Sequence, residues 1–375
     1  MQQTSSLTMP GKGIRKPTKP LAWVGQGFLL VLAISVLILL GRNLFQQPVL
    51  FAQIILSGLQ LGFVYALIAL GYTMVYGIVR IINFAHGDVF MVGAFTSYYA
   101  VARFNLHVWP AMFIKNMSPT FAVIIGTLSV MALAMLVCII LAVTNERVTY
   151  KPLREAPRIA ALITAIGVSF FLEFFGALGF VYSPRFIPYP RPFEVAAWYI
   201  KDGVYMIQAG QAAPQDSITF SNIFLIIVGV SILVQIFLQF LVRRTRIGIA
   251  MRATSVDKPT ARLMGINVDQ IISFTFAVGA GFAGLGGTLY AVAYASIWTQ
   301  LGVLPGLKAF VSAVLGGIGS IPGAFLGALI MGQAEALTMG FISTPMRDAV
   351  AFTILIIVLL VRPTGILGEP EKEKA

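Results

Sequence analysis

The sequence predicts an all-α polytopic membrane protein with about 8 to 10 transmembrane segments, some of them broken helices or half-helices. Of its 375 residues, 58% are hydrophobic and only 11% are charged, whereas soluble proteins average about 25% charged residues. The apolar residues form runs close to the roughly 20 that a helix needs to cross a bilayer. Nearly all Lys and Arg residues lie between these runs, which is typical of a topology signal and argues against a nucleic-acid binder.

The apolar runs define the expected elements in chain order. They are Leu21–Leu40, Phe51–Val79, Val89–Ala102, Phe121–Val143, Ile159–Val181, Ile218–Val242, Ile271–Ile297, Gly306–Leu315, Ile321–Phe341 and Ala349–Val361. Phe51–Val79 is too long for an upright helix and contains three glycines, so we expect it to be tilted or broken. Gly306–Leu315 is too short to cross alone, which predicts a half-helix or re-entrant segment surrounded by protein or a water-filled cavity.

The basic residues predict the orientation of the chain. We expect a basic cytoplasmic tail at residues 1–20, a transmembrane region at 21–361 and a cytoplasmic tail at 362–375. The first apolar run is too long for a signal peptide, and Gly41–Asn43 offers no small-residue cleavage site, so we expect an uncleaved anchor. If the segments alternate, 18 of the 26 Lys and Arg residues fall on the side of the tails and 8 on the other side. Both termini are therefore predicted to be cytoplasmic.

The longest predicted external connection is residues 182–217. Its five prolines exclude a continuous helix. It can serve as a docking surface for an external partner or simply as a solvated cap.

Residues for soluble-enzyme chemistry are scarce. The chain has two histidines and one cysteine, which are too few for a zinc site. It contains no Gly-x-x-x-x-Gly-Lys-Ser/Thr loop for ATP and no Gly-x-Ser-x-Gly beside a histidine. We therefore expect no catalytic residue, no metal and no cofactor bound by this chain.

Two acidic residues lie inside apolar runs, where an unpaired charge costs several kcal/mol. Glu335 has Gln333 nearby, and either a partner on another helix or a place on a transport path accounts for it. Glu173 is surrounded by aromatic residues, so a structural hydrogen bond is the expected role.

A polar string follows the second apolar run. Asn83, His86 and Asp88 lie close together with a glycine between the last two. Such a string forms either a polar turn with local hydrogen bonds or a turn inside the membrane at a broken helix, where backbone groups can meet a solute. On the second interpretation, Asn83, His86, Asp88 and Glu335 are candidates for a substrate pathway.

The stretch Arg252–Asn267 predicts a short helix between two membrane segments. Asp257 suits the N-cap, Pro259 the first turn and Gly265 the C-terminal end. Such a helix of about two turns is too short to be stable alone. It lies on the membrane surface, closes a turn or docks into a groove of a partner protein.

Several strings resemble the inner-membrane permeases of branched-chain amino acid ABC importers, of the LivH type. They are Tyr72–Gly77 (YTMVYG), Ile82–Asp88 (INFAHGD), Ala309–Phe310 and Val314–Ala324 (VLGGIGSIPGA). The resemblance covers most of residues 50–365, and the basic tail with the first segment and the insert after Val181 look like extensions. Related urea permeases usually read MAHGE where this chain reads FAHGD, which favours amino acids.

The resemblance implies a permease subunit in the bacterial inner membrane, with branched-chain or other neutral amino acids as solutes. It implies a second, LivM-like permease, two ATP-binding subunits that hold ATP and Mg²⁺, and an external solute-binding protein as partners. It also makes Arg252–Asn267 the coupling region that contacts the ATPase, with Asp257, Lys258, Pro259, Ala261, Arg262 and Gly265 as its residues. The alternatives are a urea or amide ABC permease, or a stand-alone secondary transporter or channel in which Glu335 is an ion site.

Overall fold

The computed structural model describes residues 38, 41–114, 116–154, 156–207, 212–214, 216–362 and 364–368. The contacts divide the chain into two units, residues 1–52 and 53–375, and each is described by itself. In the first unit, residues 41–46 are helical and residues 48–52 begin helix α2. The predicted tail 1–20 and nearly all of the predicted segment Leu21–Leu40 lie outside the described residues.

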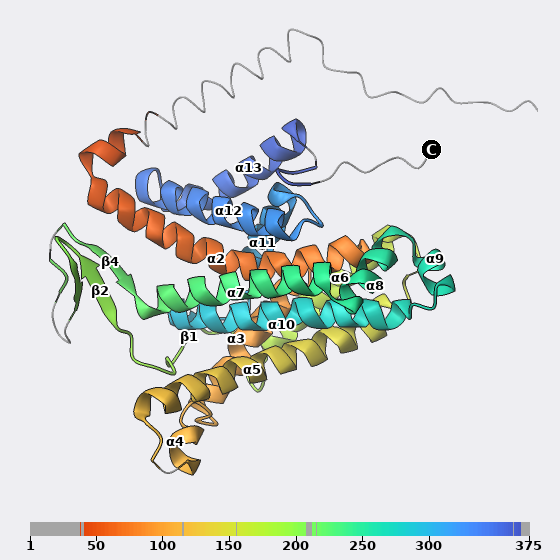
Figure 1. Ribbon diagram of the computed structural model, residues 1–375, viewed down its shortest axis with the longest axis horizontal. Helices are drawn as coiled ribbons and strands as arrows, with labels where there is room; N and C mark the ends of the chain where they lie inside the picture. Colours follow the sequence, from red (N-terminus) through yellow and green to blue (C-terminus); the bar gives the residue numbers. More distant parts are fainter. Residues whose placement is uncertain are drawn as a thin grey trace, which may run out of the picture. The chain divides into compact units, whose positions relative to one another are not determined.

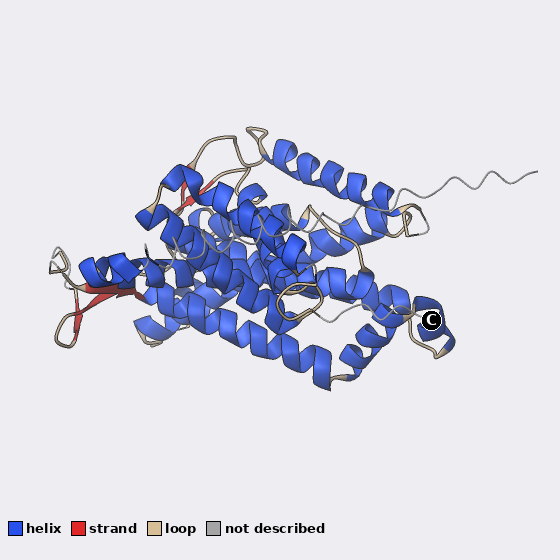
Figure 2. Ribbon diagram, turned by 90° about the horizontal axis from the view of Figure 1, so that it is seen from above, coloured by secondary structure: helices blue, strands red, loops and turns tan. Residues whose placement is uncertain are grey.

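Helices dominate the described chain (Figures 1 and 2). Within the described residues, seven helical stretches are long and apolar enough to cross a membrane, which confirms the all-α polytopic class. The helices are α2 (Pro48–Val79), α3 (His86–Ala102), α4 (Trp109–Phe113), α5 (Pro119–Asn145), the π-helix η1 (Glu146–Tyr150), α6 (Arg158–Gly176), α7 (Asn222–Arg244), α8 (Arg246–Val256), α9 (Lys258–Leu263), α10 (Val268–Tyr294), α11 (Val303–Gly316), α12 (Ile321–Phe341), the 3-10 helix η2 (Thr344–Met346) and α13 (Arg347–Val361).

Short strands lie around the predicted external connection. They are β1 (Ile187–Pro188), β2 (Ala197–Ile200), β3 (Val204–Met206), β4 (Ile218–Ser221) and β5 (Ser296–Ile297). They form an antiparallel β1–β5 pair and an antiparallel sheet in the order β3-β2-β4. No described residue between 182 and 217 is helical, as the prolines predict. The strands correct two predicted segments, because Ile218 and Ile297 belong to β4 and β5 rather than to membrane helices.

Within residues 53–375 the helix connections lie at two opposite ends of the bundle (Figure 1). At the α9 end, Lys258 contacts the last residue of α2, and Arg154 pairs with Asp269 at the start of α10. At the sheet end, β1 pairs with β5, and Gln53 of α2 bonds to Thr219 of β4. The helices therefore alternate in direction between the two ends.

Glycines let the central helices pack closely. A Cβ on Gly93 of α3 would lie 2.5 Å from Cα of Gly284 of α10. A Cβ on Gly71 of α2 would lie 2.8 Å from the carbonyl oxygen of Gly279 of α10. Small residues at helix crossings allow this close backbone approach in membrane proteins. The three helices α2, α3 and α10 form the buried centre of the bundle.

The predicted break within Phe51–Val79 is absent, whereas the predicted half-helix at Gly306–Leu315 is present. α2 runs unbroken for 32 residues, so a break within it was the wrong alternative, and the interruption falls after Val79. α11 has 14 residues and spans only about 21 Å, which fits a half-helix. Its first turn meets the start of α3, where a Cβ on Gly306 would lie 2.7 Å from Cα of Gly87.

Candidate functional site

The polar string begins where α2 ends. Arg80 has a left-handed φ of 61° and terminates the helix, and residues 80–85 are not helical. The chain then folds back beside α2, because a Cβ on Gly71 would lie 2.6 Å from Cε1 of His86. Asn83, His86 and Asp88 are 5%, 2% and 1% exposed. The string is therefore a buried break between two helices rather than a turn on the surface.

Each side chain of the string has its own contacts. Asn83 accepts a hydrogen bond of 2.7 Å from the hydroxyl of Tyr150, and Asp88 accepts one from the hydroxyl of Ser169 on α6. The Ser169 hydroxyl also lies 3.4 Å from Glu173, which agrees with the hydrogen bond expected there. Among the described residues, Nε2 of His86 and Oδ1 of Asp88 have no hydrogen-bond partner. The string thus contains two buried polar atoms that are available for a hydrogen bond to a further group.

A small cavity adjoins Asn83 and His86. Its other walls come from the end of α2, from the break and from α11 with the loop after it, at Tyr72, Val75, Tyr76, Ile81, Ile82, Phe310, Ala313 and Ile318. The space is about 10 Å³, close to that of one water-sized sphere. An amino acid side chain does not fit in a space of this size.

Glu335 lies in a different part of the bundle, in an ion cluster. Its carboxylate oxygens contact Nζ of Lys308 at 2.6 Å and the hydroxyl of Tyr65 at 2.9 Å. Lys308 also lies 2.7 Å from Asp348, and Arg347 lies 3.5 Å from Asp348. Glu335 and Lys308 are each 3% exposed. The cluster ties α2, α11, α12 and α13 together and is separate from the Asn83 string.

Lys308 corrects the count of external basic residues. The alternation of segments placed it on the external side, but it is buried in the second turn of α11. Lys308 lies inside the predicted run Gly306–Leu315, and this position was the signal that it needs a partner within the bundle. That partner is Glu335, the only acidic residue in the next run, Ile321–Phe341.

The predicted coupling region contains two helices rather than one. α8 (Arg246–Val256) was not predicted, whereas α9 (Lys258–Leu263) begins after Asp257 with Pro259 in its first turn. Gly265 ends the turn with φ of 81°. Ala261 is buried, whereas Leu263 and Met264 are 87% and 79% exposed. Leu263 at the end of α9 and Met264 directly after it therefore present apolar side chains outward.

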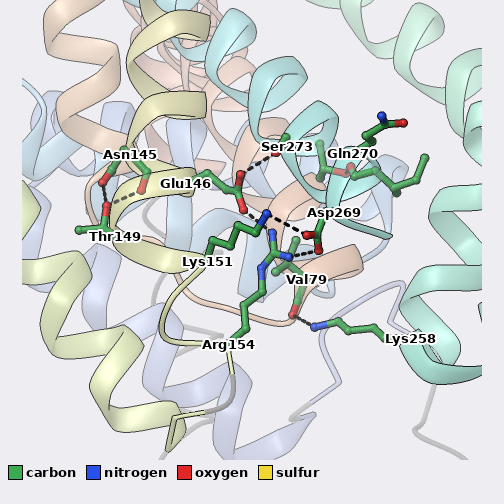
Figure 3. A network of polar contacts seen from close by, with 12 residues as sticks. Val79, Asn145, Glu146, Thr149, Lys151, Arg154, Lys258, Asp269, Gln270 and Ser273 are labelled. Atoms are coloured by element: carbon green, nitrogen blue, oxygen red, sulfur yellow. Dashed lines mark hydrogen bonds and ion pairs between the residues drawn. The ribbon is translucent and has the colours of Figure 1, made fainter. Parts of the chain in front are cut away.

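Charged side chains join α9 to neighbouring elements, and Figure 3 shows Lys258 of α9 beside Val79. Lys258 donates to the carbonyl oxygen of Val79 at 3.2 Å, and Arg262 lies 3.7 Å from Asp269. Burial and the nearby charges of Arg154, Arg80 and Arg262 lower the pKa of Lys258. Asp269 also pairs with Lys151 at 2.9 Å and with Arg154 at 2.5 Å. These contacts join residues far apart in the sequence, and no local pattern predicted them.

Comparisons with known proteins identify the family. Residues 54–359 match the family described as "branched-chain amino acid transport system / permease component". The high-affinity branched-chain amino acid transport system permease protein LivH of Salmonella typhimurium is 39% identical over 333 residues, 88% of this chain and 99% of the relative. The corresponding protein BraD of Pseudomonas aeruginosa is 39% identical over 327 residues, 86% of this chain and 98% of the relative.

A more distant relative is the probable LivH permease of Methanocaldococcus jannaschii, which is 24% identical over 350 residues, 88% of this chain and 95% of that protein. No solved structure matches the chain. The family match includes both the buried break and the ion cluster. The chain is a multi-pass membrane protein that belongs to the permease components of branched-chain amino acid transport systems.

Proposed function

We propose that the chain is the permease subunit of a binding-protein-dependent ABC importer for branched-chain or other neutral amino acids. It forms the translocation pathway with a second, LivM-like permease subunit. An external solute-binding protein delivers the solute, and two separate subunits bind ATP and Mg²⁺ and hydrolyse the ATP. The observation that carries this proposal is the 39% identity over 99% of a relative named as a high-affinity branched-chain amino acid permease.

The buried break supports a role for Asn83, His86 and Asp88 in the pathway. An amino acid carries an ammonium and a carboxylate, and both need polar partners where lipid is excluded. Nε2 of His86 and Oδ1 of Asp88 are buried polar atoms without a hydrogen-bond partner in the described chain. Transient contacts of this kind suit a pathway, since tight binding would stop the solute from leaving. Both carboxylate oxygens of Glu335 already accept hydrogen bonds, one from Lys308 and one from Tyr65. This favours a structural role for Glu335 over a place on the transport path.

We infer that the α9 end faces the cytoplasm of a bacterium and that the protein lies in the inner membrane with both termini inside. The α9 end carries the basic connections at residues 145–158 and 243–268, and cytoplasmic loops are enriched in Lys and Arg. Removing Lys308 from the external count leaves 18 basic residues against 7.

Thiol labelling tests this orientation. In a Cys138→Ser background, Ser217→Cys is expected to react with an impermeant thiol reagent in intact cells, whereas Ser255→Cys reacts only after permeabilisation. Cys138 is the only native cysteine, so replacing it eliminates background labelling by the thiol reagent. Because Cys138 is buried, the replacement leaves the surface of the protein unchanged. Labelling of both positions from the same side would overturn the topology.

We propose that α9 is the coupling helix that docks on an ATP-binding subunit. Leu263→Asp is expected to lower copurification of that subunit at least about tenfold, because a buried charge at the centre of an interface costs about 2 kcal/mol or more. Leu263 is exposed in this chain, so the substitution spares its fold. Val204→Asp on the exposed strand β3 is the matched control and should copurify normally. Equal copurification of both variants would remove the docking assignment.

Uptake of radiolabelled leucine tests the whole proposal. Cells that lack other leucine importers are supplied with this chain and its neighbouring subunit genes, and uptake is measured with and without the ATP-binding subunits. We expect leucine uptake that requires these subunits. Uptake of urea in place of leucine would support the amide permease, and leucine uptake without ATP-binding subunits would support a stand-alone transporter.

A further inference from the structure

The π-helix η1 holds the buried break in place. It continues α5 and ends at Tyr150, which is 1% exposed. The Tyr150 ring stacks on Phe276 of α10 with ring centroids 5.6 Å apart, and its hydroxyl donates to Oδ1 of Asn83 at 2.7 Å. π-helical turns are rare and are frequently found at functional sites. Asn83 therefore takes its position from a turn that lies between α5 and the α9 end.

The other end of η1 is fixed by charge. Glu146 is fully buried and pairs with Arg154, while its second oxygen accepts a 2.6 Å hydrogen bond from Ser273 of α10. Figure 3 shows the Glu146 carboxylate between Ser273 and Arg154. A buried carboxylate is stable only when its oxygens are paired, so these contacts determine where η1 begins.

The same network reaches α9. Arg154 bridges Glu146 to Asp269, and Asp269 faces Arg262 of α9. Independently, Lys258 of α9 contacts the carbonyl oxygen of Val79, four residues before Asn83. α9 is thus connected to the break on two sides: directly at the end of α2, and at Asn83 through the ion network and η1.

We propose that Tyr150 is the positioning residue through which movement of α9 reaches the buried break. The proposal rests on the proposed function, in which ATP-driven closure displaces α9. A displacement of α9 changes the contacts of Lys258 with Val79 and of Arg262 with Asp269. Packed interiors respond to such a change by switching between discrete arrangements rather than deforming gradually. A shift of the Asp269–Arg154–Glu146 set turns η1, and the Tyr150 hydroxyl carries Asn83 with it.

Tyr150→Phe isolates this step, because it removes the hydroxyl that bonds to Asn83 and keeps the ring that stacks on Phe276. In proteoliposomes that contain the complete transporter, we measure leucine uptake and ATP hydrolysis together. We expect normal assembly and ATP hydrolysis, with leucine transported per ATP lowered about fivefold, as the loss of one buried hydrogen bond predicts. Tyr99→Phe is the control, since the Tyr99 hydroxyl makes an equal 2.7 Å bond to the Val181 carbonyl near the sheet end.

A merely structural role for Tyr150 would lower uptake and ATP hydrolysis in the same proportion, and that result would overturn the proposal. Normal uptake and normal ATP hydrolysis in Tyr150→Phe, or an equal loss of leucine transported per ATP in Tyr99→Phe, would overturn it as well. Asn83→Leu gives a second test, because Tyr150→Phe should add no further loss once the acceptor is gone. Leucine uptake by the unmodified transporter tests the proposed function separately. If the unmodified transporter takes up leucine and Tyr150→Phe transports the normal amount of leucine per ATP, only the role of Tyr150 is rejected.

Discussion

Lys308→Met is expected to prevent stable insertion of the chain, and Lys308→Met combined with Glu335→Met is expected to restore it. Lys308 lies 2.6 Å from Glu335, and both are 3% exposed. Without Lys308, Glu335 keeps the partly exposed Arg347 at 3.8 Å in place of a buried cation. Breaking a buried ion pair by removing one partner costs about 3–5 kcal/mol, whereas replacing both partners by apolar residues is often neutral. That cost is a large part of a total stability of about 5–15 kcal/mol. The amount of folded chain in the membrane and its thermal stability in detergent measure the effect.

The double variant also separates the two interpretations of Glu335. After both substitutions, Asp348 keeps Arg347 at 3.5 Å, so no new unpaired acid arises from the loss of Lys308. If folding and leucine uptake both return, Glu335 is structural. If folding returns but uptake does not, the Lys308–Glu335 pair belongs to the pathway. Normal insertion of Lys308→Met alone would contradict the stabilising role of the ion pair.

Gly87→Val is expected to destabilise the protein at the upper end of the ~1–3 kcal/mol that overpacking costs, or beyond it. A Cβ at Gly87 would meet the carbonyl oxygen of Gly302 and lie 3.1 Å from Cα of Gly306. These are backbone atoms, so neither helix can relieve the clash by changing a rotamer. Thermal denaturation of the purified chain in detergent measures the loss.

Gly229→Val is the matched control for Gly87→Val. Gly229 lies on the exposed side of α7, and a Cβ there has no neighbouring heavy atom within 4 Å. Its melting temperature should stay close to that of the unmodified chain. Equal melting temperatures for the two variants would show that the contact between α3 and α11 tolerates a side chain.

Local features of the sequence predicted much of the fold. The lengths of the apolar runs predicted the membrane helices, because hydrocarbon thickness imposes a minimum length on any sequence. The position of α9 followed from Asp257, Pro259 and Gly265, since caps and turns depend on residues a few positions apart. The break after Val79 also coincided with the polar string that the sequence singled out.

Contacts between distant residues could not be predicted in this way. The partner of Asn83 is Tyr150, 67 residues away, and the partner of Asp88 is Ser169, 81 residues away. Lys308 was placed outside the membrane because alternation assigns every basic residue to a loop, and only the bundle shows its contact with Glu335. α8 is mixed in polarity and lacks the apolar run that reveals a membrane helix. The strands are too short for an alternating pattern to emerge.

The meeting of α3 and α11 has an electrostatic consequence for Asp88. Gly87 near the start of α3 and Gly302 at the start of α11 are in contact, so two helix N-termini face the same small region. The aligned peptide dipoles place roughly half a positive charge at each N-terminus. Asp88 lies in the first turn of α3, where this field acts on its carboxylate. The backbone at this meeting point thus favours negative charge on Asp88, and the hydroxyl of Ser169 adds a hydrogen bond to the same carboxylate.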